Sequence, residues 1–302
     1  MAENLEEVSE KYKIIVRDLM KVYKRGAKEV IALRGIDFEV ERQEFLSIVG
    51  PSGSGKSTLL KLLGALEKPT AGTIFYDGHS VTILDDQRAM LYRRQKVGFV
   101  WQTGNLVPGL TALKNVMLPM RLSRLSHREA EKRARILLTS LGLGARMSHR
   151  PHQLSGGENQ RVAICVALAN KPEVLLADEI TGELDTETTQ LVMQALKQVN
   201  EEFGTTVVNV THNPRVAAFA DRTLRIRDGL IEGQKHTLYG DISEVDAKGR
   251  MVIPETVRRL AGIGKRVVLK VTSEGLLIVP LESEEANNTS ASGQPESSPQ
   301  DA

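Results

Sequence analysis

The sequence predicts an α/β fold built around a parallel sheet, and two observations carry this prediction. The first is an apolar stretch, Phe45 to Val49, that passes through a glycine-rich loop into the helical pattern Leu59 to Leu63. The second is a pair of apolar strands, Val174 to Glu179 and Thr205 to Thr211, separated by a helical pattern over about residues 187–202. Strands that alternate with helices in this way form parallel sheets that are buried on both faces.

The remaining segments each have a pattern of their own. A polar segment, residues 1–12, precedes short strands at Lys13 to Val16 and Ile36 to Val40. Residues 85–169 show mostly helical spacing, and Ser126 to Glu129 has the pattern of a capping box, in which both side chains cap the helix start. We therefore expect a helical subdomain inserted into the α/β core.

The length and composition of the chain restrict the classes of function that it can have. The length of 302 residues suggests two domains, and a net charge of only +2 argues against a dedicated nucleic-acid binder. Cys165 is the only cysteine, which excludes an internal disulfide and favours a reducing compartment. The acidic start, Met1 to Glu7, lacks the apolar core of a secretory signal, and the longest apolar run, Val162 to Ala169, is far shorter than the ~18 residues that span a bilayer. We expect any membrane role to need a partner.

The glycine-rich loop, Gly50 to Thr58, has the pattern G-x-x-x-x-G-K-[ST] between a strand and a helix. Glycines let backbone N–H groups close around phosphate oxygens, and the helix dipole adds positive potential. Lys56 would reach the β- and γ-phosphates of a nucleotide, and the Ser57 hydroxyl would bind Mg²⁺. The alternative is a chance glycine- and serine-rich turn, which roughly one chain in a hundred of this length would contain.

Two further motifs point to the same chemistry. Asp178 and Glu179 end an apolar strand, where Asp178 would hold Mg²⁺ and Glu179 would orient or deprotonate water; the alternative is a solvated strand end. Leu154 to Arg161 begins another helix with a capping box of Ser155 and Glu158. The box leaves the paired glycines of this segment unexplained, and a helix start rich in free N–H groups also binds anions.

Together these motifs resemble the ATP-binding subunit of an ABC transporter. Gly50 to Ser57 is similar to the Walker A loop of that family, Val174 to Glu179 to its Walker B strand, and Leu154 to Arg161 to its signature sequence. The single residues that extend the resemblance are Gln102 of the Q-loop, Asp185 of the D-loop, the switch histidine His212, and Tyr23, which stands where the family places an aromatic ring against adenine. The resemblance covers residues 13–235 and implies a P-loop ATPase core that contains the helical subdomain.

Within the family, the branch of lipoprotein-release, macrolide-export and cell-division ATPases is the most similar. Asn105 to Pro108, Leu110 to Ala112, Asn115 to Pro119 and Ala177 to Asp185 carry this likeness. The departures from the pattern of the family are Gly104, Asn159, Cys165, Val166, Ile180 and Glu183. None of them removes a catalytic atom.

The resemblance implies a dimer in which each ATP lies between the Walker A loop of one copy and the signature sequence of the other, with closure on binding and reopening on hydrolysis. The expected catalytic residues are Glu179, His212, Gln102 and Lys56, and the expected Mg²⁺ ligands are Ser57, Gln102 and Asp178. The expected ATP contacts are Tyr23, Gly50, Pro51, Ser52, Gly53, Ser54, Gly55, Lys56, Ser57, Thr58, Ser155, Gly156, Gly157 and Asp185.

A second unit follows the ATPase core. Residues 237–282, with strands at Val267 to Val271 and Leu276 to Pro280 and a short helix at Glu255 to Ala261, resemble the AbrB-like swapped-hairpin domain, which forms intertwined dimers. Its seven Lys and Arg residues against six Asp and Glu are weak for binding DNA, so we expect dimerisation. The alternative is an unrelated small β-domain. Residues 283–302 have the composition of a disordered tail.

Two functions remain open at this point. The resemblance favours the ATP-hydrolysing subunit of a transporter or mechanotransmission complex, a homodimer that works with an integral membrane permease subunit on the cytoplasmic face of the membrane. The alternative is a soluble, ATP-switched protein that uses the C-terminal unit to bind DNA, which the weak charge opposes.

Overall fold

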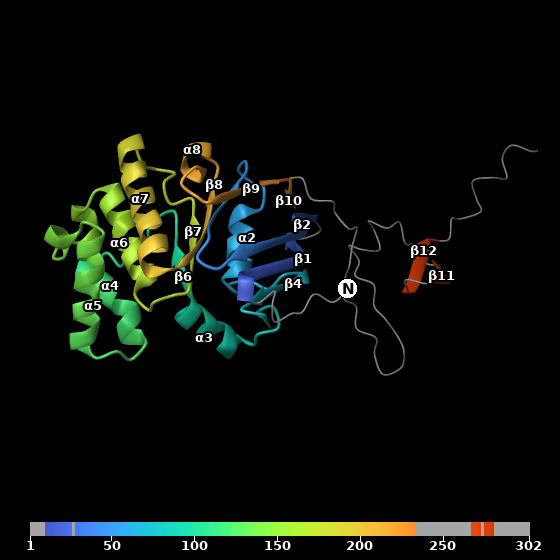
Figure 1. Ribbon diagram of the computed structural model, residues 1–302, viewed down its shortest axis with the longest axis horizontal. Coiled ribbons are helices and arrows are strands. Elements are labelled where there is room, and N and C mark those ends of the chain that lie inside the picture. Colours follow the sequence, from blue (N-terminus) through green and yellow to red (C-terminus); the bar gives the residue numbers. More distant parts are fainter. Residues whose placement is uncertain (1–9, 26–27, 233–266, 273–274, 281–302) are drawn as a thin grey trace, which may run out of the picture. The chain divides into compact units, whose positions relative to one another are not determined.

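The computed structural model describes residues 10–25, 28–232, 267–272 and 275–280. The chain divides into two compact units, Met1–Gly240 and Asp241–Ala302. The first unit contains two sheets and several helices (Figure 1), and the described part of the second is a two-stranded hairpin.

A six-stranded sheet, in the order β10-β9-β3-β8-β7-β6, forms the centre of the first unit. Its strands are β3 (Phe45–Val49), β6 (Val97–Val100), β7 (Val174–Asp178), β8 (Thr206–Thr211), β9 (Arg222–Arg227) and β10 (Leu230–Ile231). All neighbouring strands are parallel except β9 and β10. Asp178 pairs with Val210 and Val49 with Thr211, so the carboxyl ends of β3, β7 and β8 meet at one edge. The predicted parallel core is confirmed.

A separate four-stranded antiparallel sheet lies beside it. Its strands are β1 (Tyr12–Arg25), β2 (Lys28–Glu41), β4 (Ala71–Tyr76) and β5 (His79–Ser80). The sequence indicated only short strands at 13–16 and 36–40, whereas β1 and β2 have 14 residues each. The pairing of β1 shifts register between Val16 and Leu19, where Asp18 has a φ of 46°. Such bulges break the alternation by which a strand is recognised in a sequence.

Helices cover the six-stranded sheet on both faces. They are α2 (Lys56–Leu63), α3 (Asp86–Lys96), α4 (Ala112–Leu122), α5 (His127–Ser140), α6 (Gly156–Leu168), α7 (Thr186–Phe203) and α8 (Pro214–Ala217). The helix expected near 187–202 is confirmed as α7. The expected helical stretch 85–169 needs a correction, because it contains β6, which pairs with β7. A short apolar strand has no alternation that separates it from a buried helix.

Side chains at the helix starts explain where two of these helices begin. Ser155 and Glu158 form the complete predicted capping box at α6. At α5 the predicted box is incomplete, because the Ser126 hydroxyl accepts from the Glu129 N–H at 3.3 Å and also donates to the Glu129 carboxylate at 2.6 Å. That carboxylate is therefore engaged with the Ser126 side chain rather than with its backbone.

The core consists of two apolar clusters, one on each face of the six-stranded sheet. Phe45, Leu175 and Ala177 pack with α4 to α7, whereas Leu46 and Leu176 pack with α2 and the antiparallel sheet. Figure 1 shows the same separation, with the green and yellow helices on one side of the sheet and α2 on the other. Burial on both faces explains why these strands are apolar throughout.

In the second unit, β11 (Val267–Thr272) and β12 (Gly275–Pro280) pair in antiparallel fashion, which confirms the two expected strands. The expected helix at 255–261, the domain limits at 235, 237 and 282, and the tail at 283–302 lie outside the described residues. Within the described ranges, no helix is both long and apolar enough to cross a membrane.

Candidate active site

The glycine loop, Gly50 to Thr58, leaves the carboxyl end of β3 and enters α2. A Cβ on Gly50 would lie 2.1 Å from the Ile226 carbonyl oxygen, and one on Gly55 would lie 2.5 Å from that of Ala32. Gly55, the N-cap of α2, has a φ of 102°, a conformation that glycine adopts without strain. Both positions need glycine to bring the backbone N–H groups of the loop together at the helix start.

Lys56 lies folded back over this loop. Its ammonium group donates hydrogen bonds of 2.9 Å to the carbonyl oxygens of Gly50 and Pro51. It also lies 3.3 Å from Oε1 of Glu179. The lysine side chain is only 3% exposed, so its charge is held by these three oxygens.

Ser57 and Asp178 meet across the gap between α2 and β7. The Ser57 hydroxyl donates to Oδ1 of Asp178 at 2.9 Å. Burial raises the pKa of Asp178, and the hydrogen bond from Ser57 opposes that rise. A hydroxyl and a carboxylate are the hard oxygen donors that Mg²⁺ takes, together with phosphate oxygens and water.

Glu179 follows β7 with a φ of 46°, which turns its side chain away from the path of the strand. Its Oε2 lies 3.0 Å from Nδ1 of His212, and its Oε1 faces Lys56. Glu179 therefore bridges the glycine loop and the residue that follows β8. A cavity of about 270 Å³, lined by Glu179 and His212 among others, opens beside this bridge.

Gln102 lies just beyond β6 and is exposed. Its amide nitrogen would be 3.4 Å from a Cβ on Gly182, which places it beside the turn that follows Glu179. In the described part of the chain, no hydrogen bond joins the Gln102 side chain to Ser57 or Asp178. The geometry of this chain therefore puts Gln102 near the site without making it a partner of the two other expected Mg²⁺ ligands.

Gln160 is a residue that the sequence analysis missed. Its side-chain nitrogen lies 3.0 Å from the carbonyl oxygens of Trp101 and Gln102 and 2.9 Å from that of Ile180. The residue is 4% exposed. One amide thus joins α6 to the segments that carry Gln102 and Glu179. The sequence signal was a polar residue on the buried side of an apolar helix, a position that usually needs a partner.

Tyr23, the residue expected to face adenine, contacts Thr58 at the end of the glycine loop. Its hydroxyl donates to Glu67 at 2.7 Å, and Thr58 also hydrogen-bonds with it. Burial raises the pKa of the tyrosine, and the bond to Glu67 adds to the rise. The ammonium group of Lys21 lies 5.0 Å from the centre of the ring. The ring is thereby held at the edge of the glycine loop.

The paired glycines of α6 pack against the start of α7 in the same chain. A Cβ on Gly157 would lie 2.1 Å from Cγ2 of Thr188, and one on Gly156 would lie 3.0 Å from Leu184. Asp185 fixes Thr188, because its carboxylate accepts from the backbone N–H at 2.9 Å and from the hydroxyl at 2.8 Å. Close packing therefore explains the glycine at 157 without any ligand.

The two halves of the expected site make no polar contact with each other within the described part of one chain. Across the described ranges, no hydrogen bond or ion pair connects residues 155–157 with residues 50–58. The residues that do come together are Lys56, Ser57, Asp178, Glu179 and His212.

Comparison with known proteins shows that this chain is similar to ATP-binding cassettes. Residues 33–182 match the family model described as ABC transporter. An uncharacterized ABC transporter ATP-binding protein of Thermotoga maritima is 48% identical over 226 residues, which are 74% of this chain and 96% of that protein. The lipoprotein-releasing system ATP-binding protein LolD 2 of Caulobacter vibrioides is 47% identical over 222 residues, with coverage of 74% and 97%.

Two further similarities differ in coverage. The macrolide export ATP-binding/permease protein MacB of Syntrophobacter fumaroxidans is 45% identical over 235 residues, which are 77% of this chain but only 33% of that longer protein. A solved dimer of the cassette MJ0796 of Methanocaldococcus jannaschii, in a post-hydrolysis state with ADP and Pi, has a TM-score of 0.68 and 44% identity. It covers 75% of this chain and 99% of the solved one.

Proposed function

This chain belongs to the ABC transporter ATP-binding family, and we propose that its ATP sites are completed only between two copies. It is an ATP-hydrolysing subunit that acts as a dimer with membrane permease subunits. Each site would combine residues 50–58 of one copy with Ser155, Gly156 and Gly157 of the other. The dimeric MJ0796 cassette supports the proposal. The lack of hydrogen bonds and ion pairs between these two segments, among the described residues of one chain, agrees with it.

The contact of Glu179 with both Lys56 and His212 is the observation that carries the mechanism. Lys56 would leave the carbonyls of the glycine loop for the β- and γ-phosphates, which frees Glu179 to accept a proton from water. The water oxygen then bonds to the γ-phosphorus as the bond from that phosphorus to the ADP oxygen breaks. His212, which lies at Oε2 of Glu179 whereas Lys56 lies at Oε1, would also contact the γ-phosphate. The products are ADP and phosphate.

Mg²⁺ fits the oxygen donors at Ser57 and Asp178. When bound, the ion would neutralise charge that develops on the phosphate oxygens. Among the described residues, no cluster of three or more His, Cys, Asp or Glu side chains could hold a metal ion by itself. This agrees with an ion that is held largely by nucleotide phosphates and water, with one carboxylate and one hydroxyl from the protein. We keep Gln102 as a third ligand that would move in once nucleotide binds.

A groove lined by Val97, Gly98 and Phe99 of β6 is the proposed docking site for the permease. It has a volume of about 600 Å³ and lies between α3, β6 and α4. Met90 and Leu122, on its rim, are 50% and 66% exposed, although both are large and apolar. Exposed apolar side chains around a groove are typical of a protein interface. Because β6 leads directly to Gln102, motion of a permease helix in this groove would reach the active site.

We propose a class of transported substrate from the names of the relatives. Relatives named for lipoprotein release and macrolide export support an export or extraction role for amphipathic molecules at the membrane. The chain would then work on the cytoplasmic face, where ATP is supplied. The permease-associated relatives and the low net charge both oppose the DNA-binding alternative.

Residues 237–282 are proposed as an AbrB-like unit that holds two chains together without nucleotide. The antiparallel pair β11 and β12 agrees with this proposal. A tethered pair of cassettes would have a high effective concentration for ATP-driven closure. A chain that ends at residue 236 should then dimerise more weakly in light-scattering measurements without ATP. Equal dimerisation of the two forms would contradict the tethering role.

The transporter role can be tested by purification from native membranes. We expect Glu179→Gln to bind ATP without hydrolysing it and to retain an integral membrane protein in an ATP-dependent manner. Lys56→Met, which cannot hold the phosphates, is the control and should retain less. Recovery of nucleic acid and no membrane protein would contradict the transporter role.

A further inference from the structure

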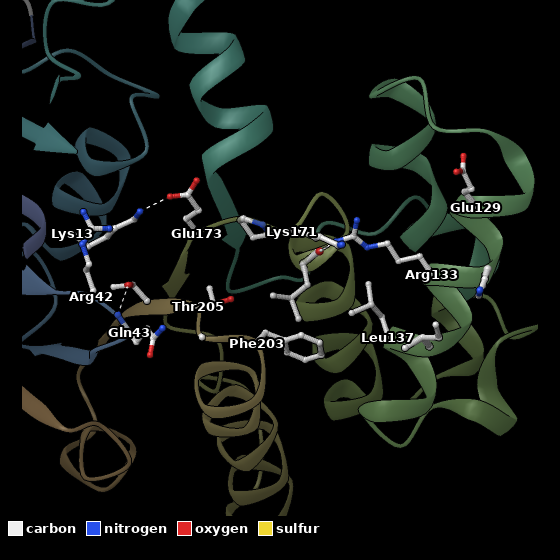
Figure 2. A pocket seen from close by; sticks show the side chains of 16 residues that line it. Lys13, Arg42, Gln43, Glu129, Arg133, Leu137, Lys171, Glu173, Phe203 and Thr205 are labelled. Carbon is white, nitrogen blue, oxygen red and sulfur yellow. Dashed lines mark hydrogen bonds and ion pairs between the residues drawn. The ribbon is translucent and has the colours of Figure 1, made fainter. Parts of the chain in front are cut away.

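A second cavity lies at the opposite edge of the six-stranded sheet from the candidate active site. It has a volume of about 630 Å³ and is drawn in Figure 2. Glu173 and Thr205 line it just before β7 and β8 begin, whereas Glu179 and His212 follow the ends of the same strands. Helix α5 forms the facing wall. Cavities of about 300–1,000 Å³ are the size that binds small organic ligands.

At one end of this cavity, the charged side chains form ion pairs with one another or with neighbouring carboxylates. Lys13 pairs with Glu173 and, at 2.8 Å, with Asp77, and Arg42 pairs with Asp77 at 2.9 Å. Burial favours the neutral form of Glu173, but hydrogen bonds from Lys13 and Lys96 outweigh it and lower the pKa of Glu173 to about 2. These groups need no further partner.

The rest of the lining carries further positive charge, and among the described residues no carboxylate forms an ion pair with these cations. The three cations are Lys132, Arg133 and Lys171. The guanidinium group of Arg133 makes one long contact, 3.5 Å to the Leu168 carbonyl oxygen, and no described carboxylate forms an ion pair with it. Glu129 lies one turn earlier on α5, but its side chain points away from Arg133 (Figure 2) and accepts from Ser126.

Burial makes this charge costly. Desolvation lowers the pKa of Arg133, which means that the surroundings disfavour its charged form. A guanidinium group stays protonated at neutral pH, so a partly buried arginine without a carboxylate is stabilised by an anion that reaches it. Arginine forms paired hydrogen bonds to carboxylate and phosphate oxygens in particular.

Apolar side chains also line this cavity. Ile136 is 56% exposed and Phe203 is 47% exposed, above buried Leu137 and Leu168. Figure 2 shows that Phe203 and Leu137 both lie in the part of the cavity away from Lys13 and Glu173. A ligand that covered Ile136 and Phe203 would remove apolar surface from water.

We propose that this cavity binds a single-chain amphiphile with an anionic head. A carboxylate or phosphate head would pair with Arg133, Lys132 and Lys171, and the alkyl chain would lie on Ile136 and Phe203. The bound molecule would contact both α5 and the segments that enter the sheet, so it would stabilise the helical subdomain against the core. The nucleotide site is at the other edge of the sheet, so ATP does not compete for this cavity.

The test is calorimetric titration of the full chain with dodecanoate below its micelle concentration. We expect one site per chain, unaffected by Mg-ATP. Arg133→Met should weaken binding by roughly tenfold or more, since a charge-assisted pair is lost. Arg135→Met is the matched control, because Arg135 is on the same helix but pairs with Glu131 at 2.7 Å. Equal affinity of the two variants, or no binding to the unmodified chain, would overturn the proposal.

Further ligands and variants test the contributions of the anionic head and the alkyl chain to binding. They also distinguish binding in the cavity from binding to a membrane surface. Dodecanol, which has no anionic head, should bind roughly tenfold more weakly than dodecanoate. Dodecyl phosphate, which has one, should also bind. Ile136→Ser should weaken binding, whereas Leu191→Ser, at a residue that is 48% exposed on α7, should not. Binding to anionic phospholipid vesicles with none to dodecanoate would assign the cations to a membrane surface and overturn the proposal.

Discussion

The carboxylate of Glu179 lies 3.3 Å from the ammonium group of Lys56. The proposed base and the proposed phosphate-binding lysine thus hold each other. Lys56 is almost fully buried and also bonds to two carbonyls of its own loop. A γ-phosphate that attracts Lys56 would weaken this pair and leave the Glu179 carboxylate available to water. Arrival of nucleotide and readiness of the base are therefore linked through one side chain.

Removal of the carboxylate tests this link. We expect Glu179→Gln to lower kcat for ATP hydrolysis by roughly 10²-fold or more, in the range of a lost general base. ATP affinity should stay equal or increase, because Lys56 no longer pairs with a carboxylate. Steady-state hydrolysis and equilibrium nucleotide binding measure the two effects. Lower ATP affinity together with an unchanged kcat would contradict the assignment.

Gln160 should affect the rate of ATP hydrolysis indirectly, because it positions the segments that carry Gln102 and Glu179. Gln160→Leu removes the donor shared by the carbonyls of Trp101, Gln102 and Ile180. We expect about 1–3 kcal/mol of lost stability from buried carbonyls without donors. We also expect a lower kcat with a KM for ATP that changes little, since none of these atoms is in the glycine loop. Gln198→Leu, where the side chain bonds to Glu202 one turn later on α7, is the control. Loss of stability with normal kcat would restrict Gln160 to a structural role.

The contact between Gly157 and Thr188 can be tested by rescue. Gly157→Ala places a methyl group 2.1 Å from Cγ2 of Thr188, and the hydrogen bond to Asp185 prevents Thr188 from rotating freely. We expect a loss of roughly 1–3 kcal/mol, as overpacking typically costs. Thr188→Ser removes that methyl group but keeps the hydroxyl, so the double variant should recover most of the loss in urea unfolding. Absence of recovery would show that another contact causes the loss.

Glu173 should contribute stability that depends on pH. The hydrogen bonds from Lys13 and Lys96 lower its folded pKa to about 2, against an ordinary value of 4.5. A lowered pKa gives stability that is fully present above the unfolded value and is lost as the pH falls from about 4.5 toward 2. The unmodified chain should therefore be more stable than Glu173→Gln at pH 7, and the difference should shrink over that acid range. A difference that does not vary with pH would contradict the ion pairs.

The sequence predicted several residues that come together at the candidate site, because strand ends and the glycine loop follow short patterns. Lys56, Ser57, Asp178 and His212 stand at strand ends or in a loop with a short pattern, and parallel strands bring those ends to one edge. Gln160 could not be placed in this way. Its three acceptors belong to segments 20 to 59 residues away, and only tertiary packing brings them to one amide.

The fold shows the same division between local and distant information. The buried strands β7 and β8 were predictable as apolar runs, and α7 as a periodic helix. The lengths of β1 and β2 could not be predicted. Bulges interrupt the alternation of apolar and polar residues in these strands, and their pairing with each other extends them. The second cavity could not be predicted either, because Arg133 and Phe203 are distant in sequence and line one cavity only in the folded chain.

The claim that two chains share each ATP site is tested most directly by mixing two inactive variants. Lys56→Ala disables the glycine loop, and Ser155→Arg disables the signature segment, so each alone should have little activity. Coexpressed chains with different tags, purified through both tags, give dimers with one intact site. We expect these dimers to hydrolyse ATP at up to about half the rate of the unmodified dimer. Activity no higher than that of either variant alone would contradict shared sites, because a site built within one chain cannot be restored by mixing.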